Sequence, residues 1–387
     1  MAGRGMSEGV TRWRISCQRL IGYDIVETPR LFDPGNRALI SAGRIEGGRR
    51  FVVVDRNFAR YHAEPIHEYF AHHGIATRIV CFPGGEENKT LERCLRILRD
   101  LDAFPIHRRD EPIIAIGGGV LTDVVGFIAS MYRRGVPHIK VPTTLMGYID
   151  ASVGIKTGVN FDAHKNRLGS FEPPLRVFLD KTFLTTLPRR HVLNGMGEII
   201  KLAIIKDSKL FQLLEEHGSR SIAEAFQNPA GGEILDRAIC GMLEELEPNL
   251  FEDDLSRRVD FGHSFSQELE ARHPDRLLHG EAVLLDIAVS TLIARKRCLL
   301  SERDTERIFG LIDRLGIVLD TAVLDRELMW RSLLDRIEHR NGLQRVPVPE
   351  AIGGCVFLND ITRREIDASI RALDARTRVQ SEPALQR

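Results

Sequence analysis

Short apolar runs alternate with amphipathic stretches through the first half of the chain. Each run has the length and composition of a buried strand, and the stretch after it has the period of a helix. The expected strands are 50–55, 77–82, 112–116 and 138–141. The expected helices are 58–73, 90–101 and 121–131, and a strand or hairpin over 12–27 begins the sheet. This alternation predicts a doubly wound parallel sheet of the Rossmann-like α/β class.

The pattern changes after Leu187-Pro188. Amphipathic stretches dominate from there and strand signals almost vanish, so residues 188–387 are expected to form an all-helical domain. The expected helical stretches are 194–216, 221–226, 233–247, 280–296 and 301–315. The Gly-rich, polar segment 1–11 is expected to be a disordered lead-in, which leaves 12–187 for the α/β domain. A ligand is expected in the cleft between the two domains.

Charge and composition narrow the function classes. The 387-residue chain carries 54 Lys and Arg against 54 Asp and Glu, so its net charge does not indicate nucleic acid or an anionic membrane as a partner. No apolar run reaches the roughly 18 residues that a membrane helix needs, and the N-terminus has no secretory signal. The six cysteines are scattered without a CxxC pair, which favours reduced thiols in a cytoplasmic protein.

Two features of the expected sheet indicate a nucleotide. Gly117-Gly118-Gly119 stands between a buried strand and a helix, where backbone N–H groups and the helix N-terminus can hold a pyrophosphate. Asp55 ends the first buried strand, at the position of an acid that binds ribose hydroxyls. The alternatives are a tight turn for the glycines and a helix N-cap for Asp55. The ordinary Gly-x-Gly-x-x-Gly fingerprint is absent from this position.

The segment 150–166 has neither a helical nor a strand period. It combines several glycines with two lysines and two asparagines, which are Lys156, Lys165, Asn160 and Asn166. A loop of this length in a compact domain is usually functional or disordered. Cationic and amide side chains between glycines suit a phosphorylated, polyhydroxylated ligand, and Arg133-Arg134 just upstream would add charge. The alternative is a solvated surface loop, with both arginines on the surface.

A glutamate and two histidines form a candidate metal set in the helical half. Glu198 and Lys201 lie three residues apart on one helix face among apolar neighbours, where a charged pair costs free energy unless it has partners. His263 and His279 each open an expected helix after a loop, and Glu with two His is a common catalytic zinc set. The alternatives are a surface ion pair for the first two residues and chance among 13 histidines for the other two.

These residues, in this order, resemble the dehydroquinate synthase-like superfamily, the sugar phosphate cyclases. The resemblance runs from about residue 12 to residue 372, nearly the whole chain. The segments that carry it are PGGEENK (83–89), GGGVLTDVVGF (117–127), YRRGVP (132–137), VPTTLMGYIDASVGIKTGVN (141–160), HKNRLGSF (164–171), LNGMGEIIK (193–201), DFGHSFS (260–266) and LHGEAV (278–283).

The resemblance implies an N-terminal nucleotide-binding domain and a C-terminal metal-binding domain. The implied cofactors are NAD and Zn2+, with Co2+ as a substitute, and the implied zinc ligands are Glu198, His263 and His279. The residues implied to contact NAD are Asp55, Asn57, Glu86, Lys89, Gly117, Gly118, Gly119, Asp123, Thr143, Thr144, Asp150, Lys156, Lys165, Phe183, Thr186 and Leu187. The implied catalytic residues of the substrate pocket are Asp150, Lys156, Asn166 and Lys201, with Lys165 between the two ligands and Arg134 near the phosphate.

Three departures separate this chain from the dehydroquinate synthases themselves. Asp260 stands two residues before Gly262 in place of the usual Asn, and Gln267 replaces a second histidine four residues after His263. The segment 339–347 replaces a lysine-bearing one. Because an acid is gained while cationic and amide partners are lost, the pocket is expected to disfavour a carboxylated substrate.

The remaining marks resemble the cyclases that use sedoheptulose 7-phosphate. The 2-epi-5-epi-valiolone synthases, which make a C7 cyclitol, are similar at KTGVNFDAHKNRLGSF, DFGHSFS, LHGEAV and GLQRVPVP. The implied reaction is transient oxidation by NAD, elimination of phosphate, re-reduction and intramolecular aldol closure. The alternatives are a synthase of 2-epi-valiolone, desmethyl-4-deoxygadusol or 3-dehydroquinate, a polyol oxidoreductase of the glycerol dehydrogenase type, or a non-catalytic binding module. The resemblance also implies a homodimer that takes a small sugar phosphate.

Overall fold

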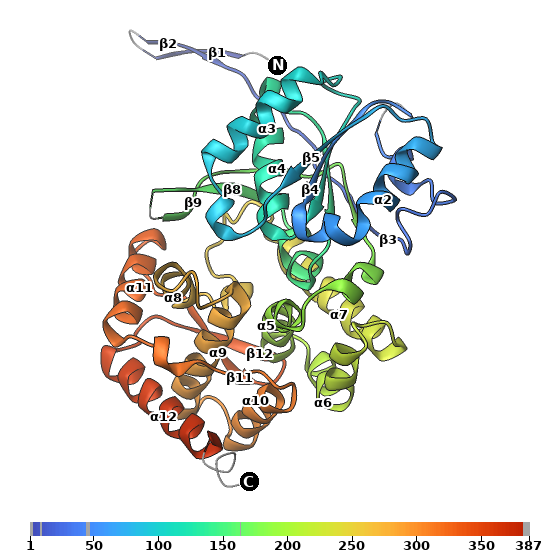
Figure 1. Ribbon diagram of the computed structural model, residues 1–387. Coiled ribbons are helices and arrows are strands. Elements are labelled where there is room, and N and C mark those ends of the chain that lie inside the picture. The colour runs from blue at the N-terminus through green and yellow to red at the C-terminus, as the bar shows by residue number, and fades with distance from the viewer. Residues whose placement is uncertain (1–2, 8–9, 44–46, 163, 382–387) are drawn as a thin grey trace.

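The computed structural model describes residues 3–7, 10–43, 47–162 and 164–381. An α/β half lies above a mostly helical half in Figure 1, and helix α5 (Arg189–Ile205) begins the lower half. The N-terminus lies at the top of the upper half and the C-terminus at the bottom of the lower half. None of the helices among the described residues is long and apolar enough to cross a membrane.

The upper half is built on a six-stranded sheet in the order β3-β10-β7-β6-β4-β5. Every neighbouring pair of strands is parallel, as the alternation of strands and helices predicts. The strands are β3 (Asp24–Glu27), β4 (Arg50–Asp55), β5 (Thr77–Phe82), β6 (Ile113–Gly117), β7 (His138–Pro142) and β10 (Arg176–Leu179). The sequence pattern did not predict β10, which is only four residues long.

Both faces of the four inner strands of this sheet are buried. Along β4, Phe51 and Val53 enter one apolar core while Val52 and Val54 enter another, because successive side chains of a strand point to opposite faces. One core is covered by α1 (Ala38–Ser41) and α2 (Arg56–His72). The other is covered by α3 (Leu91–Ala103) and α4 (Gly119–Met131), on the opposite side of the sheet in Figure 1. This arrangement explains why the strands are apolar without alternation.

The lower half packs its helices around α5 and α9, which are buried along most of their length. Its other helices are α6 (Ser208–Ala223), α7 (Pro229–Leu246), α8 (Ser266–Arg272), α10 (Glu302–Arg314), α11 (Arg326–His339) and α12 (Arg363–Ser381), with α9 spanning His279–Lys296. The stretch 194–216, expected as one helix, is divided at Asp207. The Asp207 side chain accepts hydrogen bonds from the N–H groups of Lys209 and Leu210 and so caps α6.

The expectation of an all-helical second domain is wrong at one place. Strands β11 (Val346–Ala351) and β12 (Gly354–Leu358) pair antiparallel. Pro347 and Pro349 lie in β11, and proline normally argues against a strand because it lacks an N–H donor. A sheet of two strands has only edges, so prolines are tolerated there while Val346 and Val348 are buried.

Two hairpins replace segments that were expected to lack regular structure. In the segment 150–166, β8 (Lys156–Phe161) pairs with β9 (His164–Phe171) after a π-helical turn, η3 (Gly147–Ala151). Near the N-terminus, β1 (Gly3–Ser7) pairs with β2 (Val10–Arg14) and projects from the upper half in Figure 1. The expectation of a disordered lead-in is therefore wrong for the described residues of 1–11. Backbone pairing joins such hairpins without needing the apolar pattern on which the prediction relied.

Candidate active site

Glu198, His263 and His279 come together between the two halves, from three different elements. Glu198 lies on α5, His263 on the loop before α8, and His279 is the first residue of α9. One ligand atom from each lies within 4.8 Å of the others. The Nε2 atoms of His263 and His279 are 3.9 and 3.6 Å from Oε1 of Glu198. Such a spacing leaves room for one ion between the three donors.

Two glycines allow α5 and α9 to approach closely enough for this cluster. A Cβ on Gly197 would lie 2.8 Å from the carbonyl oxygen of Gly280, and a Cβ on Gly280 would overlap the carbonyl oxygen of Asn194. The N–H of Gly280 also donates to Oδ1 of Asn194 at 2.6 Å. Because backbone touches backbone at this crossing, Glu198 and His279 are held side by side.

Lys201 lies one helical turn from Glu198 and forms an ion pair with it through Nζ and Oε2. Both side chains are almost fully buried. Burial alone would raise the pKa of Glu198, but the Lys201 ammonium and the two imidazoles lower it well below its usual range. The interpretation of this pair as a surface ion pair is therefore wrong. Both oxygens of Glu198 lack a hydrogen bond of ordinary geometry among the described residues, so they are available to a cation.

The two imidazoles are oriented by different acceptors. The Nδ1 of His263 is 3.2 Å from the carbonyl oxygen of Phe261, and the Nδ1 of His279 is 3.2 Å from Oε2 of Glu270. Each arrangement turns Nε2 toward Glu198. Burial would lower the pKa of His279, but its interactions with Glu198 and Glu270 raise it to about 10. The carboxylates around His279 therefore favour a positive charge at this position, and a donor set of two imidazoles and one carboxylate fits Zn2+.

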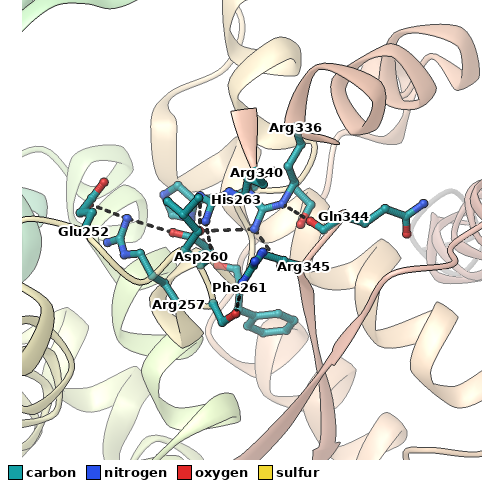
Figure 2. Close-up of polar contacts among 12 residues, drawn as sticks. Glu252, Arg257, Asp260, Phe261, His263, Arg336, Arg340, Gln344 and Arg345 are labelled. Carbon is teal, nitrogen blue, oxygen red and sulfur yellow. Dashed lines mark hydrogen bonds and ion pairs between the residues drawn. The ribbon is translucent and has the colours of Figure 1, made fainter. Parts of the chain in front are cut away.

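A group of arginines lies behind His263. Figure 2 shows Arg257, Arg336 and Arg340 converging on Asp260, the acid that stands in place of the usual Asn. Burial would raise the pKa of Asp260, but these guanidinium groups lower it. The backbone N–H of His263 donates to the carbonyl oxygen of Asp260 at 2.9 Å. The negative charge gained at Asp260 is therefore balanced within the protein, which the sequence pattern alone did not reveal.

The carboxyl edge of the sheet brings the candidate nucleotide residues together. A Cβ on Gly117 would lie 3.1 Å from Cβ of Asp55, and one on Gly84 would lie 2.6 Å from Oδ2 of the same residue. The Asp55 side chain accepts from the N–H groups of Asn57 and Phe58, so it caps α2. Its Oδ1 makes both of these bonds, which leaves Oδ2 for a ribose hydroxyl.

The glycine turn itself is closely packed. A Cβ on Gly118 would lie 3.1 Å from Cγ2 of Thr144, and one on Gly119 would lie 2.9 Å from Cβ of Ala151. Gly118 is the N-cap of α4 and provides no side-chain cap. The N-terminal N–H groups of this helix therefore remain suited to an anion, and the turn fits a pyrophosphate.

The β8–β9 hairpin links the nucleotide edge to the metal cluster. The Nζ of Lys89, a buried group, donates to Oδ2 of Asp123 and to Oδ1 of Asn166, both at 2.6 Å. Burial would lower the pKa of Lys89, but Asp123 and Glu86 raise it. Lys165, next to Asn166, pairs with Glu270 of α8.

Asp150 and Lys156 have distinct surroundings. Asp150 lies on the π-helical turn, where burial and the charge of Glu198 raise its pKa. Such a carboxyl can keep a proton or share one with a ligand. Lys156 is exposed and pairs with Glu252, which also pairs with Arg257 of the arginine group.

Several expected residues lie apart from the site or only support it. Arg134 is exposed just past the C-terminal end of α4, roughly 20 Å along the helix axis from the glycine turn at its N-terminal end. No contact joins it to the metal cluster among the described residues. Phe183 is buried and packs edge-on against Phe58, behind the start of α2. The backbone N–H of Thr143 donates to the carbonyl oxygen of Gly117 at 3.0 Å, so Thr143 lies against the glycine turn. No hydrogen bond or ion pair joins Thr186 or Leu187 to Asp55 or the glycine turn among the described residues.

Sequence reasoning missed three charged residues of this region: Glu252, Glu270 and Lys140. Lys140 is fully buried on β7, and its Nζ donates to the carbonyl oxygens of Ala151 and Gly154 at 3.3 and 2.9 Å. A lysine inside the apolar strand 138–141 was a signal that could have been used, because a buried charge needs partners. Glu252 and Glu270 gave no such signal in their polar surroundings.

Comparisons with known proteins agree over most of the chain. The family model described as 3-dehydroquinate synthase N-terminal matches residues 79–194, and the C-terminal model matches residues 195–339. A 2-epi-5-epi-valiolone synthase of Actinomyces sp. is 45% identical over 94% of this chain and 97% of its own length. One from Streptomyces albus is 47% identical over 92% of this chain and 89% of its own.

A solved structure is also similar. It is ValA, a 2-epi-5-epi-valiolone synthase from Streptomyces hygroscopicus subsp. jinggangensis 5008 with NAD+ and Zn2+ bound. It is 43% identical, superimposes with a TM-score of 0.91, and the match covers 94% of this chain and 100% of that one.

Proposed function

Because the chain belongs to the 3-dehydroquinate synthase family, we propose that it acts as a 2-epi-5-epi-valiolone synthase. This enzyme is a phosphorus–oxygen lyase that cyclises sedoheptulose 7-phosphate, releases phosphate, and depends on NAD and zinc. The observation that carries the proposal is the convergence of Glu198, His263 and His279 beside Lys201. The relatives and the solved structure of the same name, each more than 40% identical, support the choice of product.

We assign the metal to Glu198, His263 and His279. One carboxylate and two imidazoles leave coordination positions for substrate hydroxyls, as in catalytic rather than structural zinc sites. Co2+ would occupy the same donors. When bound, zinc would polarise a substrate oxygen as a Lewis acid, and NAD would accept a hydride and later return it.

We assign the dinucleotide to the carboxyl edge of the sheet. Asp55 would hold ribose hydroxyls through its free oxygen, and the turn at Gly117–Gly119 would hold the pyrophosphate against the start of α4. The hairpin and the turns beside it, including Lys89 and Lys165, would close over the nicotinamide end. Because NAD is regenerated in each turnover, it is expected to stay bound.

The pocket residues would orient the sugar phosphate. Lys201, buried beside the metal ligands, would stabilise negative charge that develops on a substrate oxygen. Asp150 would share a proton with a substrate hydroxyl, and Asn166 would donate from its amide. Lys156 would leave Glu252 and bind the substrate. Arg134 would assist with the phosphate only from another molecule or after a rearrangement, because it lies beyond the far end of α4.

The experiment that tests the proposal is incubation of the purified protein with sedoheptulose 7-phosphate, NAD+ and zinc. We expect stoichiometric phosphate release without net accumulation of NADH, and NMR of the product should identify 2-epi-5-epi-valiolone. Net NADH would instead indicate a polyol dehydrogenase, and another cyclitol would indicate a different cyclase. Lys156→Ala is expected to lose most turnover, and full retention would refute its assignment.

The finer statements on assembly and location are also proposals. We propose a homodimer on the basis of the family resemblance. We propose a cytoplasmic location, because all six cysteines are free and four of them are exposed. We further propose that residues 12–187 form the NAD-binding domain and residues 188–387 the zinc- and substrate-binding domain.

A further inference from the structure

Glu270 stands between a metal-ligand candidate and a lysine of the other half of the molecule. It lies on α8, and only 12% of its side chain is exposed. Its Oε2 is 3.2 Å from Nδ1 of His279, and its Oε1 accepts from Nζ of Lys165 on β9. The carboxylate therefore has one oxygen on each partner. Neither the metal set nor the expected NAD residues include it.

The contact with His279 decides which ring nitrogen faces the metal. When Glu270 accepts a hydrogen bond from Nδ1–H, the lone pair of the imidazole is on Nε2, which is the atom 3.6 Å from Glu198. A carboxylate in this position also raises the basicity of the ligand nitrogen. His263 is held differently, by the neutral carbonyl of Phe261. His279 is thus the ligand whose orientation depends on a charged side chain.

The contact with Lys165 links the Glu270 side chain to the upper half of the molecule. Lys165 is 3.9 Å from Oε1 of Glu86, and the neighbouring Asn166 accepts from Lys89. The series Glu86, Lys165, Glu270 and His279 therefore runs without a break from the nucleotide edge to the metal cluster. A shift of the hairpin would move the ammonium that holds Glu270 in place.

We infer that Glu270 is a positioning residue for the metal ligand His279, and that Lys165 acts on metal binding through Glu270. The inference rests on the proposed function for the identity of the ion. Loss of the carboxylate should leave His279 free to turn and should weaken zinc binding about 10- to 100-fold. Loss of the lysine should weaken it less, because the carboxylate remains.

The test is the zinc affinity of the full-length protein, measured by competition with a chromophoric chelator in the absence of NAD and substrate. The variants are Glu270→Gln, Lys165→Met and the double variant, with Glu268→Gln on the same helix as the matched control. We expect the control to bind like the wild type. We expect the double variant to bind no more weakly than Glu270→Gln alone, because Lys165 has no route to the metal without the carboxylate.

Two outcomes would overturn the inference. Wild-type affinity in Glu270→Gln would refute the positioning role, and strictly additive losses in the double variant would refute the coupling. If Glu270→Gln does not fold, Glu270→Asp replaces it, with a smaller loss expected because the shorter carboxylate reaches less far. The visible spectrum of the Co2+-loaded protein should change in the Glu270 variant and not in the control.

Failure of the inference and failure of the proposed function are distinguishable. If the wild-type protein makes the cyclitol and the Glu270 variant binds zinc normally, only the inference is refuted. If the wild-type protein binds zinc but makes no cyclitol, and the Glu270 variant binds zinc weakly, only the proposed function is refuted.

Discussion

At the scale of single residues, the site is defined by charges that the surrounding apolar helices cannot leave unpaired. Glu198 and Lys201 lie within α5, and most other residues of that helix are buried. Their spacing marked them in the sequence, because such a pair in an apolar stripe needs partners. The histidines carried no comparable signal, and only the folded chain brings His263 and His279 to Glu198.

Replacing Glu198 separates the metal role from the stabilising role. Glu198→Gln should abolish tight zinc binding and cyclase activity, and it should cost about 3–5 kcal/mol in stability because Lys201 is left buried without its counter-charge. The double variant Glu198→Gln/Lys201→Met should recover much of that stability without recovering zinc. The measurements are zinc content after dialysis and the free energy of unfolding in denaturant. Tight zinc binding by either variant would contradict the assignment of Glu198.

Metal binding should release a proton from His279. In the metal-free protein the pKa of His279 is raised to about 10 while that of His263 is lowered to about 3 by burial and by the charge of Lys201. Of the three metal ligands, only His279 carries a proton at pH 7.5. Zinc should therefore displace about one proton from the ligands, and the affinity for zinc should rise as the pH rises toward 10. Calorimetry in buffers of different ionisation enthalpy measures this number, and a value near zero would refute the protonation scheme.

The same shift affects the stability of the metal-free protein. Because the folded-state pKa of His279 is higher than its unfolded value, its contribution to stability is complete below about pH 6.5 and is lost as the pH rises toward 10. Zinc removes this dependence by replacing the proton.

At Asp55 the two roles that the sequence left as alternatives, a ribose ligand and a helix N-cap, do not exclude each other. Oδ1 of Asp55 caps α2, and Oδ2 remains for a ligand.

At the scale of elements, the crossing of α5 and α9 sets the distance between Glu198 and His279. The backbones touch at Gly197 and Gly280, where no side chain fits. A sequence shows these glycines but not that two helices meet at them. This is why the metal set could be proposed from residue types and resemblance, but not from spacing.

Gly280→Ala should disturb this crossing. The added methyl group would overlap the Asn194 carbonyl oxygen, so the first turn of α9 must shift, and both zinc affinity and stability should fall. Gly310→Ala is the matched control, because a Cβ there meets nothing within 4 Å and an alanine inside α10 should stabilise by about 0.5–1 kcal/mol. Thermal unfolding and chelator competition measure both variants. Unchanged zinc affinity in Gly280→Ala would show that the crossing does not position the ligands.

Elements with a strong hydrophobic period were predictable, and elements held by backbone pairing were not. The strands 50–55 and 77–82 agree with β4 and β5 to the residue. β4 is buried and continuously apolar, as expected of an inner parallel strand, whereas β5 is a partly exposed edge strand that still carries an apolar run. The hairpin β8–β9 was expected as an irregular loop, although Thr157 and Val159 are buried on one of its faces. Its glycines hid that alternation, since Gly158 and Gly169 face each other across the strands.

At the scale of the whole molecule, the active site is assembled from both halves. The hairpin of the upper half contacts the lower half through Lys165 with Glu270, Lys156 with Glu252, and the edge-on rings of Phe171 and Phe251. Residues from Asp55 to His279 thus contribute to one site only after both halves have folded. The order of domains was predictable from the change of pattern near residue 187, whereas these contacts between distant segments were not.

The most direct test of the account is a crystal structure of the protein with NAD and zinc, with anomalous scattering recorded at the zinc absorption edge. We expect one strong peak at about 2.0–2.2 Å from an oxygen of Glu198 and from Nε2 of His263 and His279. The nicotinamide ring should lie beside this peak, with the pyrophosphate at Gly117–Gly119. A peak bound by other residues, or no peak between these three side chains in a catalytically active crystal, would contradict the account.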